Sequence, residues 1–440
     1  AELARRMRGF LRDLVDPPDR NGDTLPDYPA VEDLNIGVIS SDMGVMGYRG
    51  IRSCELADFG DDGCFRNTPS RTVPGCPASY AEKWLSRNPG NAGGYSPEQM
   101  ANDFACIGTL GTAGCGFEQQ FKAMRKAVVE NHGIGGCNEG FLRPDSIVTL
   151  IFVTDEEDCS VKPEHPYMFD PARVGDLGGL NIRCFRNPDF VQPFSEYAAA
   201  FRSLREDPNR IFIAMIVGVP PDAPACEGDG DRLGACLAVP DMIPRPNAVG
   251  DNVEPSCIVP GLGTAYPPVR FVQLAMEIER QGVDTYVSSI CRPDWTDAIG
   301  AIADRIGNRI SIICLTDPEF PFDRDRCEAP GCRMVAHLGD AGPCPADPSC
   351  PCAGGTCADP YTGEPCVPLY LDDGIGVETG RRWRRCSMRQ ATRTAGPDGC
   401  SEPRNAGWYW QPVSSEGCGV VEFHDAWEGA AFSMECRDVP

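Results

Sequence analysis

The sequence is poor in histidine, in basic residues and in long apolar runs, and each shortage excludes a class of protein. Only 4 histidines occur in 440 residues, and none stands at zinc-ligand spacing, which argues against a structural zinc site. Lys and Arg number 40 against 64 Asp and Glu, and the net charge is -24. This composition does not supply the basic face that binds phosphates, so we expect no nucleic-acid partner.

No apolar run reaches the roughly 20 residues that span a bilayer. No signal peptide opens the chain either. We therefore expect membrane contact only through an N-terminal lipid anchor that is not present in this chain.

Cysteine, in contrast, is abundant, with 24 residues. The number is even and the residues are spread along the chain, which is typical of a disulfide framework formed in an oxidising compartment. Twelve lie from Cys314 to Cys436 and twelve before them, so each part can pair internally. We expect an extracytoplasmic protein, secreted or held at the cell surface or outer membrane.

Apolar β-branched runs alternate with amphipathic segments over the first two thirds of the chain. The runs that read as strands are 34–41, 146–154, 210–218 and 284–290. Helical spacing of apolar residues marks 1–16, 116–130, 193–207, 269–282 and 294–307. This order predicts an α/β fold of three layers, with a mainly parallel sheet that binds ligands at the carboxyl ends of its strands.

Two long Pro-, Gly- and Cys-rich excursions interrupt this order, at about 53–104 and 219–269. They are too long for plain connections, so we expect surface loops pinned by disulfides. We assign 1–308 to the α/β domain and 309–440 to a small, irregular, cysteine-rich C-terminal module held by covalent staples. For the aromatic run GWYW at 407–410 we favour burial in that module over a contact with carbohydrate or protein.

Oxygen-bearing side chains gather where two predicted elements meet the crevice of the sheet. The segment FVTDEEDCS ends a buried strand with Thr154 and Asp155, and carboxylates at such a strand end face the ligand crevice. The loop GTLGTAG leads into a helix, so the hydroxyl of Thr109 or Thr112 can reach the same place. Hydroxyl and carboxylate oxygens suit Mg²⁺, Mn²⁺ or Ca²⁺.

A second oxygen-rich loop follows the opening helix. Asp19, Asn21 and Asp23 have the alternating spacing that begins calcium loops. The twelfth position is Ala30 in place of glutamate, and Asp27 can substitute for it. A second calcium site and a solvated turn both remain open for this loop.

Several of these segments resemble von Willebrand factor A (vWA) domains, and more closely the cysteine-rich vWA lipoproteins of myxobacteria and related bacteria. The segments that carry the resemblance are IGVISSDMG, the GDDG turn, the run from Cys106 to Gln119, GFLRPDSIVTLIFVTDEEDCS and GWYW. It covers most of residues 1–310 and the remainder weakly. It implies a Rossmann-like sheet with a metal-ion-dependent adhesion site, or MIDAS.

The resemblance implies that Thr112 is the loop threonine of this site and Asp155 its distal aspartate, with Mg²⁺ or Ca²⁺ bound between them. The DxSxS motif that completes the site in the family is not in this chain. It stands at the end of the first strand, just before a helix like the opening one, so we expect motif and strand to precede residue 1.

We therefore expect a binding or adhesion protein, in which a cation keeps an open position that an acidic group of a protein partner fills. Glu156, Glu157 and Asp158 would form the rim that selects this partner. The alternative is a structural component of a surface filament or envelope assembly with a vestigial metal site. No nucleophile elbow or cysteine nucleophile is recognisable, so we do not expect an enzyme.

Overall fold

The computed structural model describes nearly all of the first two thirds of the chain and chiefly the strands of the last third. The described residues are 2–18, 31, 33–51, 54–69, 74–88, 95–112, 114–143, 146–311, 315–316, 332–338, 344, 352–353, 356–357, 370–378, 381–390, 393, 395–396, 399–400, 407–412, 418–424 and 431–436. The chain divides into two compact units, of which the first comprises Ala1–Val15 and Val31–Ile306 and the second Asp16–Ala30 and Gly307–Pro440. Each is described by itself.

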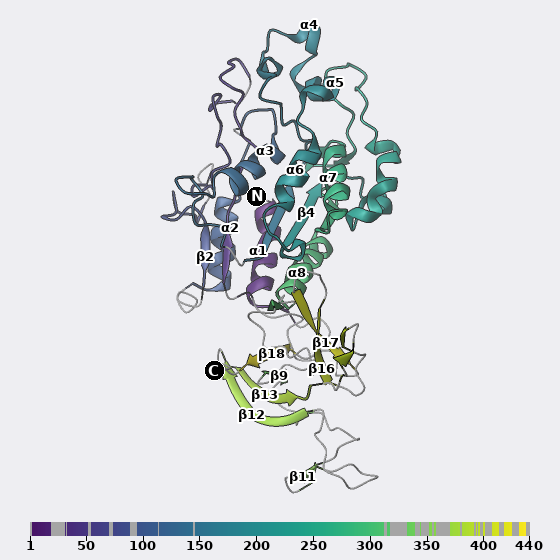
Figure 1. The fold of residues 1–440 in the computed structure, drawn as a ribbon. Helices are drawn as coiled ribbons and strands as arrows, with labels where there is room; N and C mark the ends of the chain where they lie inside the picture. Colours follow the sequence, from purple (N-terminus) through teal and green to yellow (C-terminus); the bar gives the residue numbers. More distant parts are fainter. Residues whose placement is uncertain are drawn as a thin grey trace. The chain divides into compact units, whose positions relative to one another are not determined.

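A parallel sheet of three strands forms the centre of the first unit (Figure 1). Its strands are β3 (Val148–Val153), β4 (Ile211–Val217) and β7 (Asp284–Ser289), in the order β3-β4-β7. The register pairs Val148 with Ile211, and Phe212 with Asp284. The predicted α/β class and these three predicted strands are confirmed.

The first predicted strand is different. Residues 34–41 do not join the parallel sheet, because β1 covers only Leu34–Ile36 and pairs antiparallel with β2 (Leu85–Arg87) in a sheet of two strands. Gly37, which follows β1, lies so close to the ring of Phe65 that a side chain there would overlap it. The regular strand ends at this close approach.

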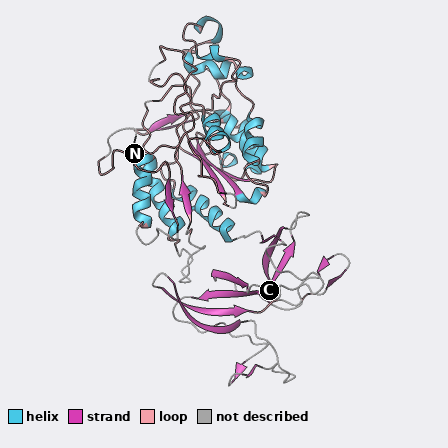
Figure 2. Ribbon diagram, turned by 60° about the vertical axis from the view of Figure 1, so that its left-hand side comes forward, coloured by secondary structure: helices cyan, strands magenta, loops and turns pink. Residues whose placement is uncertain are grey.

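Helices alternate with the parallel strands, as the apolar spacing predicts (Figure 2). They are α1 (Glu2–Val15), α2 (Pro97–Ile107), α3 (Gln120–Arg125), continued by a π-helical turn (Lys126–Glu130), α4 (Val174–Leu177), α5 (Arg183–Arg186), α6 (Phe194–Arg202), α7 (Val269–Glu279) and α8 (Thr296–Ser311). Short 3₁₀ turns are Pro166–Phe169, Leu180–Ile182, Pro188–Phe190, Pro208–Arg210, Pro224–Cys226, Gly230–Ala238 and Pro240–Met242. Helix α2 lies largely within the predicted excursion and is capped by Ser96, whose hydroxyl accepts the N–H of Gln99.

The core is packed on both faces of β4, since every residue of that strand is buried. On one face, aromatic rings from α3, α6 and α7 meet those of β3: Phe121, Phe152, Phe201 and Phe271 belong to one cluster. The Phe121 and Phe271 ring centroids are 4.6 Å apart and those of Phe152 and Phe271 5.7 Å apart. This cluster fixes α3 and α7 beside the carboxyl end of β3.

The two excursions are pinned by disulfides, as predicted. Cys54–Cys115, Cys64–Cys137 and Cys76–Cys106 tie the first excursion to the rest of the unit, and Cys226–Cys236 and Cys257–Cys291 hold the second, which also contains the hairpin of β5 (Cys257–Val259) and β6 (Gly263–Ala265). With Cys159–Cys184, all twelve cysteines of the first unit pair internally. Such a framework is typical of proteins that fold outside the cytoplasm.

The described part of the second unit is antiparallel β structure, and not the irregular chain that we expected. The largest sheet has the order β12-β13-β9-β18, and a second has the order β16-β17-β8. The strands are β8 (Leu315–Thr316), β9 (Cys332–Leu338), β10 (Cys352–Ala353), β11 (Thr356–Cys357), β12 (Tyr370–Glu378), β13 (Arg381–Met388), β14 (Ala395–Gly396), β15 (Gly399–Cys400), β16 (Gly407–Pro412), β17 (Cys418–His424) and β18 (Ala431–Cys436). Trp408 is buried and donates its indole N–H to the carbonyl of Met388 at 3.1 Å, as our preference for burial requires.

Because Phe271 is fully buried against the rings of Phe121 and Phe152, Phe271→Ala removes a large part of the core between α7 and β3. We expect a loss of about 3–5 kcal/mol in the free energy of unfolding of the first unit. Denaturant titration followed by tryptophan fluorescence measures it. The control is Ile134→Ala, at a side chain 99% exposed, which should leave the midpoint unchanged.

Candidate functional site

The segment after β3 is held at the carboxyl edge of the sheet by contacts of its backbone and of Thr154. The N–H of Thr154 donates to Ile216 of β4 at 3.2 Å, and the carbonyl of Asp155 accepts the N–H of Tyr266 at 2.8 Å. The Thr154 hydroxyl accepts the side-chain amide of Gln120 at 2.9 Å. The Asp155 side chain is left exposed. The predicted carboxylate thus lies at the carboxyl end of a parallel strand.

Asp158, in contrast, is 1% exposed. Its Oδ1 accepts the N–H of Phe121 at 2.9 Å and the hydroxyl of Ser160 at 2.7 Å. Its Oδ2 lies 3.1 Å from Nη2 of Arg270. Asp158 therefore joins the start of α3 to the start of α7, and its burial separates it from the exposed rim on which we expected it.

Glu157 is also occupied by internal contacts. Its carboxylate accepts the backbone N–H of Arg270 at 2.9 Å and that of Asp158 at 3.0 Å. Burial raises the pKa of Glu157 to about 8, against the lowering effect of Arg270. Of the three predicted rim residues, only the Glu156 side chain forms no hydrogen bond or ion pair with the described residues.

Glu156 lies among carboxylates, and no basic side chain of the described residues lowers its pKa or that of Glu118. Burial raises the pKa of Glu156 to about 8, and the charges of Glu118 and Asp155 raise it further. Burial also raises the pKa of Glu118, to which the charges of Asp155 and Asp42 add. We call Glu118, Asp155 and Glu156 the acidic crest. Like charges that cannot all ionise at low cost favour binding of a cation or a proton.

Sequence reasoning missed Glu118 and Asp42, which reach the crest from two other segments. The N–H of Gln119 donates to Ser41 at 3.2 Å and its side-chain amide to Gly44 at 3.0 Å. The carbonyl of Glu118 accepts an N–H from the segment after β3 at 2.8 Å. The one acidic residue in the first turn of the helix predicted over 116–130 was the available signal for Glu118.

The two threonines of the Gly-Thr loop differ in their surroundings. Thr109 is buried and its hydroxyl donates to the carbonyl of Ala105 at 2.8 Å, so it completes the end of α2. Thr112 is exposed. No contact among the described residues joins Thr112 to Asp155, and the metal site that the resemblance implies for this pair stays a prediction. The other predicted ligands, Asp19, Asn21, Asp23 and Asp27, lie outside the described residues.

The oxygen atoms around the crest have the chemistry of a cation site. In the described part of the chain, no three carboxylate, histidine or cysteine side chains are placed to hold a metal ion together. However, Mg²⁺ in proteins is often held by one or two carboxylates with several waters. Gln120 is almost fully buried, and its Oε1 has no hydrogen-bond donor among the described residues. A water or hydrated cation beside Thr154 would satisfy it.

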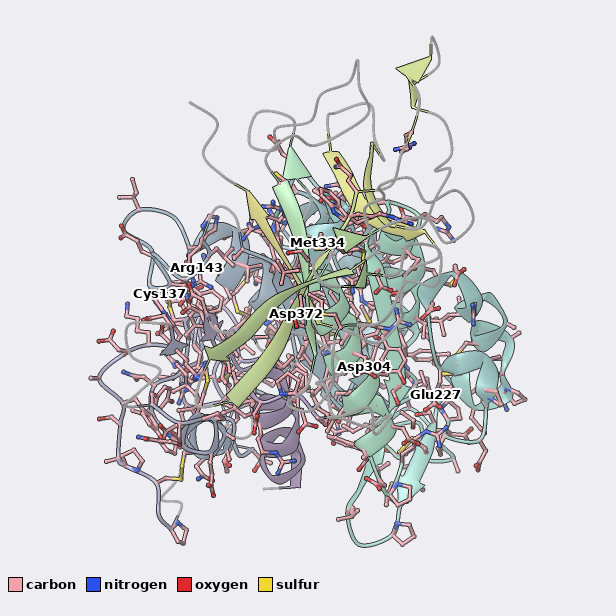
Figure 3. The ribbon with its side chains drawn as sticks, turned by 90° about the horizontal axis from the view of Figure 1, so that it is seen from below. Cys137, Arg143, Glu227, Asp304, Met334 and Asp372 are labelled. Carbon is pink, nitrogen blue, oxygen red and sulfur yellow. A yellow bond between two sulfur atoms is a disulfide. The ribbon has the colours of Figure 1, made fainter. Side chains whose placement is uncertain are left out.

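The neighbouring strand ends are closed by protein groups. The Ser256 hydroxyl donates to the carbonyl of Gly218, just after β4. The end of β7 is closed by Glu227, which is labelled in Figure 3. Its carboxylate accepts the N–H of Ser289 at 2.9 Å and forms an ion pair with Arg292. Over the described ranges, the crest at the end of β3 has no such ion pair, and its Asp155 is exposed to solvent.

Comparisons with protein-family models, curated proteins and solved structures give no match. No helix in the described part of the chain is long and apolar enough to cross a membrane.

Arg270→Met should strongly destabilise the first unit, because it leaves the buried carboxylate of Asp158 without its cation. We expect a loss of about 3–5 kcal/mol in the free energy of unfolding. Denaturant titration measures it. The double variant Asp158→Asn with Arg270→Met should recover a large part of this loss, and the ion-pair account is wrong if the double variant is less stable than Arg270→Met.

Glu156→Gln tests the strain within the crest through its pH dependence. A carboxyl group whose pKa is about 8 in the folded chain and lower in the unfolded chain contributes a stability that falls as pH rises between the two values. The variant removes this fall, so its melting temperature should exceed that of the wild type at about pH 8 and match it at about pH 4. Differential scanning calorimetry across this range measures both. An equal difference at the two pH values would contradict the assignment.

Proposed function

We propose that this chain is an extracytoplasmic binding protein whose acidic crest takes up a divalent cation and presents it to a protein partner. The observation that carries the proposal is the gathering of Glu118, Asp155 and Glu156 at the carboxyl end of a parallel strand, where burial and the charge of Asp155 raise the pKa of both Glu118 and Glu156. A crest of this kind is the usual ligand-binding position of an open α/β sheet.

The crest residues have separate roles in this proposal. Asp155, whose side chain is exposed, is the ligand that we expect to contact the cation directly. Glu156 and Glu118 supply further negative charge, and the cation would supply the positive charge that this group lacks. Gln120 Oε1 and Thr154 offer neutral oxygens beside them. Mg²⁺ and Ca²⁺ both prefer such hard oxygen ligands.

A partner would then complete the coordination with an acidic group of its own, and Glu156 would discriminate among partners at the rim. Thr112 remains the predicted hydroxyl ligand from the Gly-Thr loop. The exported, disulfide-rich character of the chain agrees with a role at the cell surface, and we propose no catalytic step, because no described side chains form a nucleophile and base pair at the crest.

Isothermal titration calorimetry with MgCl₂ and with CaCl₂ tests the proposal. We expect binding by the wild type, and a loss of about tenfold or more in affinity for Asp155→Ala, since a hard cation loses a charged ligand. Asp241→Asn, at an exposed carboxylate outside the crest, is the matched control and should bind like the wild type. The absence of binding by either cation, or equal binding by Asp155→Ala, would reject the cation site.

A further inference from the structure

Two loops beside the crest hold large apolar side chains in solvent. Met46, Leu56 and Phe59, which we call the apolar loop surface, are 36%, 55% and 73% exposed. Single exposed apolar residues are common on proteins, whereas a group of them marks an interaction site.

The three side chains start from neighbouring points of the backbone. The N–H groups of Val45 and Gly47, on either side of Met46, both donate to the carbonyl of Ala57, at 2.8 and 2.9 Å. Ala57 directly follows Leu56. The N–H of Gly60, which follows Phe59, donates to the carbonyl of Leu56 at 2.8 Å.

The inner side of these loops is fixed, so the exposed side chains are held in place. Val45 and Ala57 are buried in one apolar cluster with Cys115 and Phe117. The disulfide Cys54–Cys115 joins the loop to the segment that carries Glu118. Pre-ordering of this kind lowers the entropy cost of binding a partner.

The backbone at Met46 has an unfavourable conformation, and its side chain is partly exposed. Its φ angle is 51°, a left-handed conformation that L residues other than Asn and Asp seldom adopt. Glycines occupy such positions at no steric cost, and Gly44 and Gly47 do so on either side. A methionine that accepts this strain to stand in solvent points to a function for its side chain.

Negative charge surrounds the apolar loop surface. Glu55 and Asp58 are exposed beside its side chains. Asp58 pairs with Arg49 at 3.3 Å, but both groups are largely exposed and such pairs are weak. No described basic residue pairs with Glu55. Asp42 accepts the N–H of Gly44 at 2.9 Å, so its carboxylate connects this surface with the crest.

We propose that the apolar loop surface docks a protein partner that presents apolar side chains flanked by lysine or arginine. This inference rests on the proposed role of the chain as a binding protein, but it does not require that the crest binds a cation. The net charge of -24 opposes both a second copy of this chain and an anionic membrane as occupants.

The test uses the full chain and three synthetic peptides of equal length, one of Lys with Leu and Phe, one of Glu with Leu and Phe, and one of Lys with Ser. Fluorescence anisotropy should show the tightest binding for the first. Leu56→Ser with Phe59→Ser should weaken it about fivefold or more, because apolar anchors dominate such interfaces. The matched control is Ile258→Ser with Leu262→Ser, an equally exposed apolar pair on another hairpin, which should bind like the wild type.

Met46→Gly separates docking from a structural role. It removes the side chain and relieves the left-handed strain, so we expect weaker peptide binding together with a raised melting temperature. The proposal is overturned if the Leu56 and Phe59 double variant binds the first peptide as tightly as the wild type does. It is also overturned if the wild type shows no preference for the first peptide over the other two.

Two other occupants are distinguished by separate measurements. Self-association in sedimentation that the double variant abolishes would assign the surface to a second copy, and flotation with phosphatidylglycerol vesicles that it abolishes would assign it to a membrane; either result overturns the proposal. Peptide binding should survive EDTA, so failure of the cation site and failure of this docking surface remain distinguishable.

Discussion

The arrangement of the first unit depends on one buried carboxylate, that of Asp158. It accepts the N–H of Phe121 in the first turn of α3 and a hydroxyl from its own loop, and it pairs with the guanidinium of Arg270 on α7. Removal of a carboxylate from water costs several kcal/mol unless its hydrogen bonds and its charge are both satisfied. Here both are satisfied by groups that different elements supply. The ion pair therefore fixes α3, α7 and the loop after β3 in one position.

In this fixed loop, the side chains of the four consecutive acidic residues 155–158 have two kinds of surroundings. Glu157 and Asp158 face inward to backbone N–H groups and to Arg270. Asp155 and Glu156 stand at the edge, where the charges that act on Glu156 are those of Glu118 and Asp155. Glu157 and Asp158 hold the fold through these internal bonds, whereas Asp155 and Glu156 keep a preference for positive charge. The residues that stabilise the loop thus allow a neighbour such as Glu156 to keep a strongly shifted pKa. Ionisable groups with shifted pKa values gather at functional sites.

The sequence was sufficient for the parts that repeat a local pattern. The all-apolar run Ile211–Val217 could only be a covered strand, and α7 follows from its apolar spacing. It was insufficient at Gly37, where the strand that the β-branched run predicts has already ended and the ring of Phe65 from another loop packs against the backbone. The inward turn of Asp158 was likewise invisible, because adjacent acidic residues look alike until the position of Arg270 is known.

The crest itself shows why a site of this type escapes a linear search. Glu118 and Asp155 are far apart in the chain, and they meet because the segment before α3 is bonded on one side to the loop after β1 and on the other to the loop after β3. No core element makes these contacts. The disulfide Cys54–Cys115 adds a covalent link from the same segment to the apolar loop surface. A chain that places its binding groups on long loops needs such staples. A loop that is disordered in the free protein would lose conformational entropy each time it binds a partner, and this loss weakens binding.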